Sequence, residues 1–190
     1  THSDTEGEDY IHFNEMPLYR FNTYFGVNTV HYADLIDISE KQPLNMGGII
    51  KNALKVTFFK PFFAGDKTKK VLRPWSQKFL AALAGLMFIG YVGEDGFPKI
   101  VPIIQGQSVS SSRIVFTMKP YDKMLSDLKD GARVAIYGLS LAMEGVLVKG
   151  KFTKAKGDFG YMDIDTVFNP CPPKHGYVYP EVENVAVTEF

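Results

Sequence analysis

A β-hairpin signal between residues 87 and 104 limits the possible folds of this chain more than any other feature. The segment reads MFIGYVGEDGFPKIVPII, with two apolar runs around Glu94-Asp95-Gly96. Asp-Gly between strand-like runs indicates a hairpin, because the central turn positions need φ > 0. Pro98 follows the turn, where a strand start or a sheet edge tolerates proline. We therefore predict an antiparallel hairpin with strands over 87–92 and 99–105.

The segments around this hairpin alternate between strand-like and helical patterns. Proline suits a first helical turn, so Pro74 predicts a helix that precedes the hairpin. After the hairpin we predict a serine-rich polar loop over 106–112, a strand over 114–118, a helix over 121–128, strands over 133–139 and 143–153, and a proline-rich loop over 167–177. This order predicts a mainly β fold, a β-barrel with flanking helices.

The composition is that of a globular protein of one domain, or of one domain with an extension. Of 190 residues, 45% are hydrophobic and 22% are charged, and the formal net charge is zero, which argues against nucleic acid as a partner. The single cysteine, Cys171, excludes an internal disulfide and favours a cytoplasmic location. The apolar stretch 79–92 contains two glycines and is too short to span a bilayer.

Charge is distributed unevenly along the chain. Residues 1–41 carry eight acidic and two basic residues, residues 42–74 carry seven basic and one acidic residue, and residues 75–190 are balanced. We therefore expect 75–190 to form the barrel domain with a C-terminal loop. Residues 1–74 are expected to be an N-terminal extension that packs on the barrel or on a partner subunit.

An amphipathic pattern runs through residues 45–63. Apolar residues surround Lys51 and Lys55, which lie four residues apart on one face of a helix. A basic amphipathic helix can contact an anionic membrane or a partner. The alternative is an ordinary helix packed on its own or on a neighbouring subunit, and this alternative is favoured because amphipathic helices are the norm in globular proteins.

Three segments in order resemble the pyridoxamine 5'-phosphate oxidase-like proteins, the FMN-binding split barrels. They are the hairpin GYVGEDGFPKIVPI, then RIVFTMKPYDKMLSDLKDG, then ARVAIYG with GVLVKGKFTKAKG. The likeness covers roughly residues 76–157. It implies a split barrel that forms a homodimer, with FMN in a groove between the subunits.

The resemblance also implies which residues would hold the cofactor. A flavin phosphate needs cations, hydroxyls or backbone N–H groups, and Lys123 falls on the basic position of the family near a helix start. The isoalloxazine ring needs an apolar wall, which the second strand supplies in the family. The implied set is Val101, Pro102, Ile103, Ile104, Thr117, Met118, Lys119 and Lys123. Without a flavin, the lysines would be solvated surface residues and the apolar residues would be barrel core.

Two departures from the family argue against oxidation of pyridoxamine phosphate. Val101 stands where the oxidase has a phosphate-binding arginine, and the oxidase's C-terminal arginine and proline are missing. The function favoured is flavin-dependent redox chemistry on a small-molecule substrate. Alternatives are the same barrel with deazaflavin or haem, and a non-catalytic flavin-binding or storage protein. The loops 106–112 and 167–178 would determine the substrate, but they contain no group that identifies it. His175 could face a pocket, and the favoured alternative is an ordinary loop histidine.

Overall fold

The computed structural model describes residues 2–17, 19–20, 26–36, 38, 41, 43–66, 68–82, 85–142, 144–170 and 176–183. The chain divides into two compact units. The smaller unit is built mainly from residues up to Pro43, whereas the larger unit runs from Leu44 to Cys171 and continues from Gly176 to Val182. The expectation that residues 1–74 form an extension packed on the barrel or on a partner stays a prediction.

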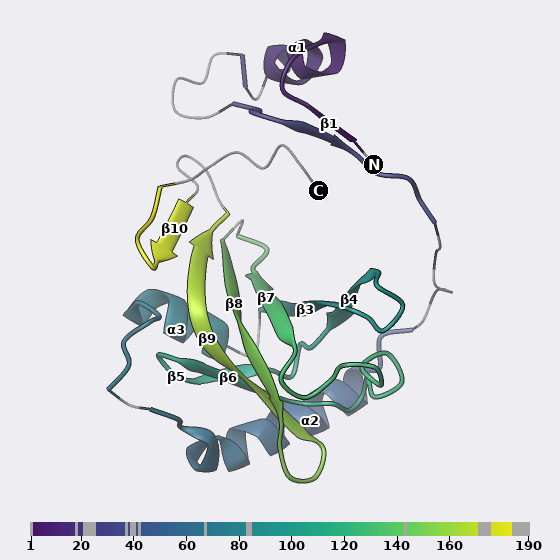
Figure 1. Ribbon diagram of the computed structural model, residues 1–190. Helices are drawn as coiled ribbons and strands as arrows, with labels where there is room; N and C mark the ends of the chain where they lie inside the picture. Colours follow the sequence, from purple (N-terminus) through teal and green to yellow (C-terminus); the bar gives the residue numbers. More distant parts are fainter. Residues whose placement is uncertain are drawn as a thin grey trace. The chain divides into compact units, whose positions relative to one another are not determined.

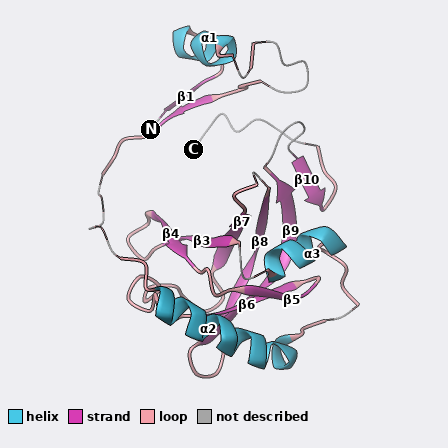
Figure 2. Cartoon of the chain, turned by 180° about the vertical axis from the view of Figure 1, so that it is seen from behind, coloured by secondary structure: helices cyan, strands magenta, loops and turns pink. Residues whose placement is uncertain are grey.

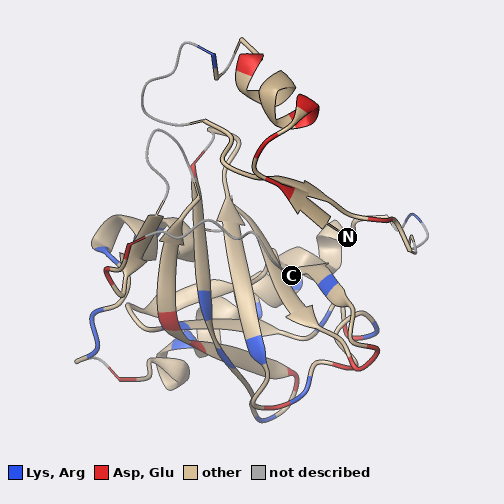
Figure 3. Cartoon of the chain, turned by 45° about the horizontal axis from the view of Figure 1, so that its top comes forward, with Lys and Arg blue, Asp and Glu red and all other residues tan. Residues whose placement is uncertain are grey.

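The smaller unit is held together by polar contacts. Strands β1 (His2–Asp4) and β2 (Val30–Tyr32) pair antiparallel, and α1 (Glu8–Glu15) has no buried residue. The Asn14 side chain donates to the Val27 carbonyl and accepts from the Val27 N–H, both at 2.9 Å. The Tyr32 hydroxyl donates to the Asp9 carboxylate at 2.5 Å, and this bond raises the pKa of Tyr32 to about 12. Acidic residues dominate the charged positions of this unit (Figure 3).

The larger unit contains an eight-stranded antiparallel sheet (Figure 1). The strand order is β4-β3-β7-β8-β9-β6-β5, with β10 paired to β9. The strands are β3 (Leu86–Val92), β4 (Pro98–Pro102), β5 (Gln107–Ser110), β6 (Arg113–Thr117), β7 (Arg133–Leu139), β8 (Gly145–Lys154), β9 (Phe159–Asn169) and β10 (Gly176–Tyr179). The predicted hairpin is β3 and β4, with Gly96 at φ 80° in its turn.

The sheet curls around a main apolar core, and Val56, Val115 and Phe159 form a second, smaller buried cluster. Inward residues alternate along the strands, and β3, β4, β6, β7, β8 and β9 contribute to the same main cluster. The fully buried side chains include Ile89, Ile114, Ile136, Phe152 and Ile164. This architecture confirms the predicted mainly β class, a barrel with flanking helices.

Helical segments flank the barrel (Figure 2). They are α2 (Met46–Phe59), the 3-10 helix η1 (Lys60–Phe63) and α3 (Pro74–Ala81). The Asn45 side chain caps α2 by accepting from the Gly48 N–H at 2.9 Å. Gln107 of β5 donates to the Ala53 carbonyl and to Thr57, which fixes α2 on this strand. As predicted, a helix begins at Pro74 and precedes the hairpin.

The predicted polar loop over 106–112 is wrong, because residues 107–110 form β5. This strand pairs with β6 around a bulge between Ser108 and Ser110. Its serines are buried, and their polar groups are satisfied locally: the Ser108 hydroxyl donates to the Ser110 carbonyl at 2.8 Å. Serine-rich composition suggested a loop, but hydrogen bonds within the strand make burial of these hydroxyls possible.

The predicted helix over 121–128 is a series of turns instead. Its apolar positions do face the core, since Leu125 and Leu128 are buried. Side chains bond to two backbone carbonyls of this segment. The Ser126 hydroxyl donates to the Lys123 carbonyl, and the Tyr91 hydroxyl lies 2.8 Å from the Met124 carbonyl oxygen. These side-chain bonds offer the carbonyls an alternative to a helical ladder and stabilise the turns.

The prediction of a loop from residue 167 is also incorrect, because β9 continues to Asn169 and 176–179 form β10. β9 has 11 residues and pairs with β6, β8 and β10. Met162 and Ile164 point into the core and alternate with Asp163 and Asp165. Cys171 and His175, within the predicted loop, lie outside the described residues.

Candidate functional site

The residues predicted to hold FMN lie at the ends of two strands. Val101 and Pro102 end β4 and are followed by Ile103 and Ile104; Thr117 ends β6 and is followed by Met118, Lys119 and, within the turns, Lys123. The side chains of Val101 and Ile103 belong to the barrel core. Those of Lys119 and Lys123 are exposed, and neither ammonium forms an ion pair with a described residue.

Gln105 joins these two strand ends. Its Nε2 donates to the carbonyls of Thr117, at 2.7 Å, and Lys119, at 3.2 Å. The Thr117 hydroxyl donates to the same Lys119 carbonyl at 2.7 Å. Gln105 is fully buried, and its Oε1 accepts no hydrogen bond from a described residue. We call Gln105 and these two carbonyl groups the Gln105 clamp. It holds the end of β6 beside the segment that follows β4, and it leaves the Gln105 Oε1 without a hydrogen bond from a described residue.

A charged network supports the turns that carry Lys123. The Asp127 carboxylate accepts from the Tyr91 hydroxyl and from the Lys99 ammonium, both at 2.6 Å. Hydrogen bonds from Lys99 and then Tyr91 lower the pKa of Asp127 to about 2. Burial, followed by the bond to Asp127, raises the pKa of Tyr91. The network ties residues 121–128 to the hairpin.

Replacing Asp127 with asparagine is expected to lower the free energy of unfolding by about 1–2 kcal/mol at pH 7, because the negative charge that pairs with Lys99 is lost and one of the two acceptor oxygens becomes an NH2 donor. Because the pKa of Asp127 is lower in the folded state than its ordinary value near 4, the ionised carboxylate stabilises the fold at pH values above about 4. This contribution disappears as the pH falls toward 2. Urea unfolding at pH 7 and pH 3 measures the difference. Asp122→Asn, at an exposed position, is the control; an equal Asp127 effect at both pH values would contradict the assignment.

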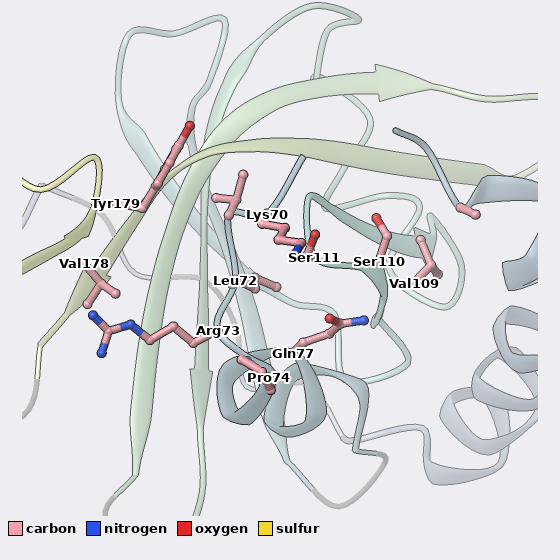
Figure 4. Close-up of a pocket in the computed structure, with 12 residues that line it drawn as sticks. Lys70, Leu72, Arg73, Pro74, Gln77, Val109, Ser110, Ser111, Val178 and Tyr179 are labelled. Atoms are coloured by element: carbon pink, nitrogen blue, oxygen red, sulfur yellow. The ribbon is translucent and has the colours of Figure 1, made fainter. Parts of the chain in front are cut away.

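The structure also contains a cavity of about 730 Å³ that the sequence analysis did not predict (Figure 4). The segment before α3, β5 with the turn after it, and β10 form its walls. None of the eight predicted cofactor residues lines it. The polar lining residues are Lys70, Arg73, Gln77, Ser110, Ser111 and Tyr179, and the apolar ones include Val71, Leu72, Val109 and Val178.

Ser111 holds the wall that carries the cations of this cavity. Its hydroxyl donates to the Lys69 carbonyl, and its carbonyl accepts from the Leu72 N–H at 2.8 Å. Neither Lys70 nor Arg73 pairs with an acidic side chain of the described residues. A cavity of this size, lined by both cationic and apolar side chains, suits a small anionic molecule. The sequence feature that could have indicated this cavity is the basic segment 67–73, which lies outside the part of the chain that resembles the family.

Other site types find little support among the described residues. No group of three or more His, Cys, Asp or Glu side chains in this part of the chain is placed to hold a metal ion. Within the same residues, no helix has the length and apolar character needed to cross a membrane.

Comparisons with known proteins find solved structures that are partly similar to this one. No protein-family model matches the sequence, and no curated protein matches it. HupZ of Group A Streptococcus aligns at 13% identity with a TM-score of 0.44, over 53% of this chain and 97% of HupZ. A candidate pyridoxamine 5'-phosphate oxidase from Lactobacillus delbrueckii aligns at 16% identity with a TM-score of 0.44, over 53% of this chain and 95% of that one. At these values the comparisons assign neither a family nor a ligand.

Proposed function

We propose that this chain is a flavin-binding protein that holds FMN at the adjoining ends of β4 and β6. The observation that supports the proposal is the Gln105 clamp, because it places the predicted ring-binding segment 101–104 beside the predicted phosphate-binding segment 117–119. The two segments are more than ten residues apart in sequence.

The residues present fit the chemistry of FMN. Its phosphate carries a charge of about −2 and three acceptor oxygens, which suit the exposed ammonium groups of Lys119 and Lys123. The ring needs an apolar wall, for which the half-buried side chains of Pro102 and Ile104 are available. The side chains of Val101 and Ile103 stay in the core, so their contribution would come from the backbone.

The bound flavin would supply hydride or electron transfer, and the chain would position the ring and adjust its electronic properties. We assign no residue to proton transfer. The favoured activity is redox chemistry on a small-molecule substrate in a reducing, cytoplasmic setting; the alternative is flavin storage. Reduction of the bound flavin by NADH or NADPH at a useful rate supports the enzyme, whereas a flavin that neither nucleotide reduces favours storage.

The absorption spectrum of the purified protein tests the cofactor. A flavin spectrum, with FMN released on denaturation, supports the proposal. A Soret band would replace it with haem, and a deazaflavin released on denaturation would replace it with that cofactor. A colourless protein that takes up no added FMN would contradict flavin binding.

We also expect a homodimer, since a flavin bound between subunits needs a second copy of the chain. Light scattering at micromolar concentration should give twice the chain mass of 21.3 kDa. A monomer mass with flavin still bound would contradict this expectation without affecting the cofactor assignment.

A further inference from the structure

The helical segment α2–η1 carries a continuous row of exposed apolar side chains. Met46, Ile50, Leu54 and Phe58 recur every four residues, and Phe62 continues the row in η1. Residues four apart lie on the same side of a helix. Their exposed fractions are 53%, 56%, 61%, 83% and 82% in chain order. We call these five residues the apolar row.

The apolar row is separate from the face that attaches α2 to the barrel. Ile49, Ala53 and Val56 are buried and form that face. Packing on the barrel therefore explains one apolar face of α2 and leaves the apolar row open to solvent. A surface helix needs only one apolar stripe, and a large exposed apolar surface usually marks an interaction site.

The surroundings of the apolar row are basic. Residues 44–65 contain three lysines and no acidic residue. Lys55 pairs with Asp158, whereas Lys51 and Lys60 form no ion pair with a described residue. The α2–η1 surface therefore combines exposed phenylalanines with positive charge.

We infer that the apolar row is a contact surface for an anionic lipid bilayer, lying in the interfacial region without crossing the membrane. Phenylalanine and leucine side chains enter the boundary between headgroups and acyl chains, while lysines are attracted to anionic headgroups. A symmetric pair of α2 helices is disfavoured, because a two-fold interface would place this basic surface against itself. The inference is independent of the proposed flavin function.

Flotation with lipid vesicles tests this inference on the full chain. The protein should bind vesicles of phosphatidylcholine with roughly one third phosphatidylserine, bind pure phosphatidylcholine weakly, and dissociate at high salt. The double variant Phe58→Ser with Phe62→Ser should bind the anionic vesicles about tenfold or more weakly. Leu141→Ser is the matched control, since Leu141 is 95% exposed in the turn between β7 and β8 and lies outside the apolar row.

Two results would overturn the inference. One is a wild-type protein that binds neither kind of vesicle. The other is a lipid-free dimer that the double variant converts to a monomer, which would make the apolar row a self-association surface. The exposure of both phenylalanines predicts an unchanged melting temperature for the double variant, so loss of vesicle binding with an unchanged melting temperature supports the inference.

Discussion

Replacing Phe152 with alanine is expected to lower the free energy of unfolding by about 3–5 kcal/mol, the cost of removing a large aromatic side chain from a core. Phe152 is fully buried on β8 and stacks on Phe116, with ring centroids 5.8 Å apart. Its ring also fills the space beside Gly160, where an added Cβ would lie 2.4 Å from Phe152 Cε2. Alanine would therefore leave a cavity between β6, β8 and β9.

Urea unfolding monitored by circular dichroism measures this effect. The smaller change Phe152→Leu should cost less, about 1–2 kcal/mol, because it keeps part of the volume, and it covers the case in which the alanine variant does not fold. Phe58→Ala is the matched control, since Phe58 is 83% exposed. If Phe152→Ala and Phe58→Ala cost the same, the barrel core is not packed as described.

Replacing Lys123 with alanine is expected to weaken FMN binding by about 1.5–3 kcal/mol, the contribution of a hydrogen bond to a charged group. The dissociation constant would rise about tenfold to a hundredfold. Riboflavin lacks the phosphate and should bind the wild type and the variant almost equally. Isothermal titration of the flavin-free proteins with both flavins measures the difference.

Two further variants locate the phosphate. Lys156→Ala removes another exposed lysine, in the turn between β8 and β9, and should leave FMN affinity unchanged. Arg73→Ala removes a cation from the lining of the 730 Å³ cavity. If FMN affinity falls with Arg73→Ala but not with Lys123→Ala, the phosphate binds in the cavity and the β4–β6 assignment is wrong.

The hairpin and the strands β6, β7 and β8 could be predicted because their signals are local. The Asp-Gly turn and the alternation in β7 and β8 depend only on neighbouring residues. β5 could not be predicted in this way, because its serines suit a strand only where bonds such as that from Ser108 to Ser110 satisfy them. For β9, the alternation of Met162 and Ile164 with aspartates was a usable signal that the sequence analysis did not apply.

The candidate site, too, could be predicted from the sequence only in part. The segments 101–104 and 117–119 were selected from sequence, but their proximity depends on Gln105, whose contacts no local pattern reveals. The apolar pattern of α2 indicated a helix but could not distinguish the buried Val56 from the exposed Phe58, because burial depends on where the barrel lies. The cavity beside Arg73 combines three distant segments and has no local signature.

Equilibrium titration of the flavin-free wild-type protein with FMN tests flavin binding most directly. The proposal predicts saturable binding of one FMN per chain, with riboflavin binding more weakly because it lacks the phosphate. The absence of saturable binding of either flavin, in a protein whose circular dichroism and cooperative unfolding show the β fold, would contradict it.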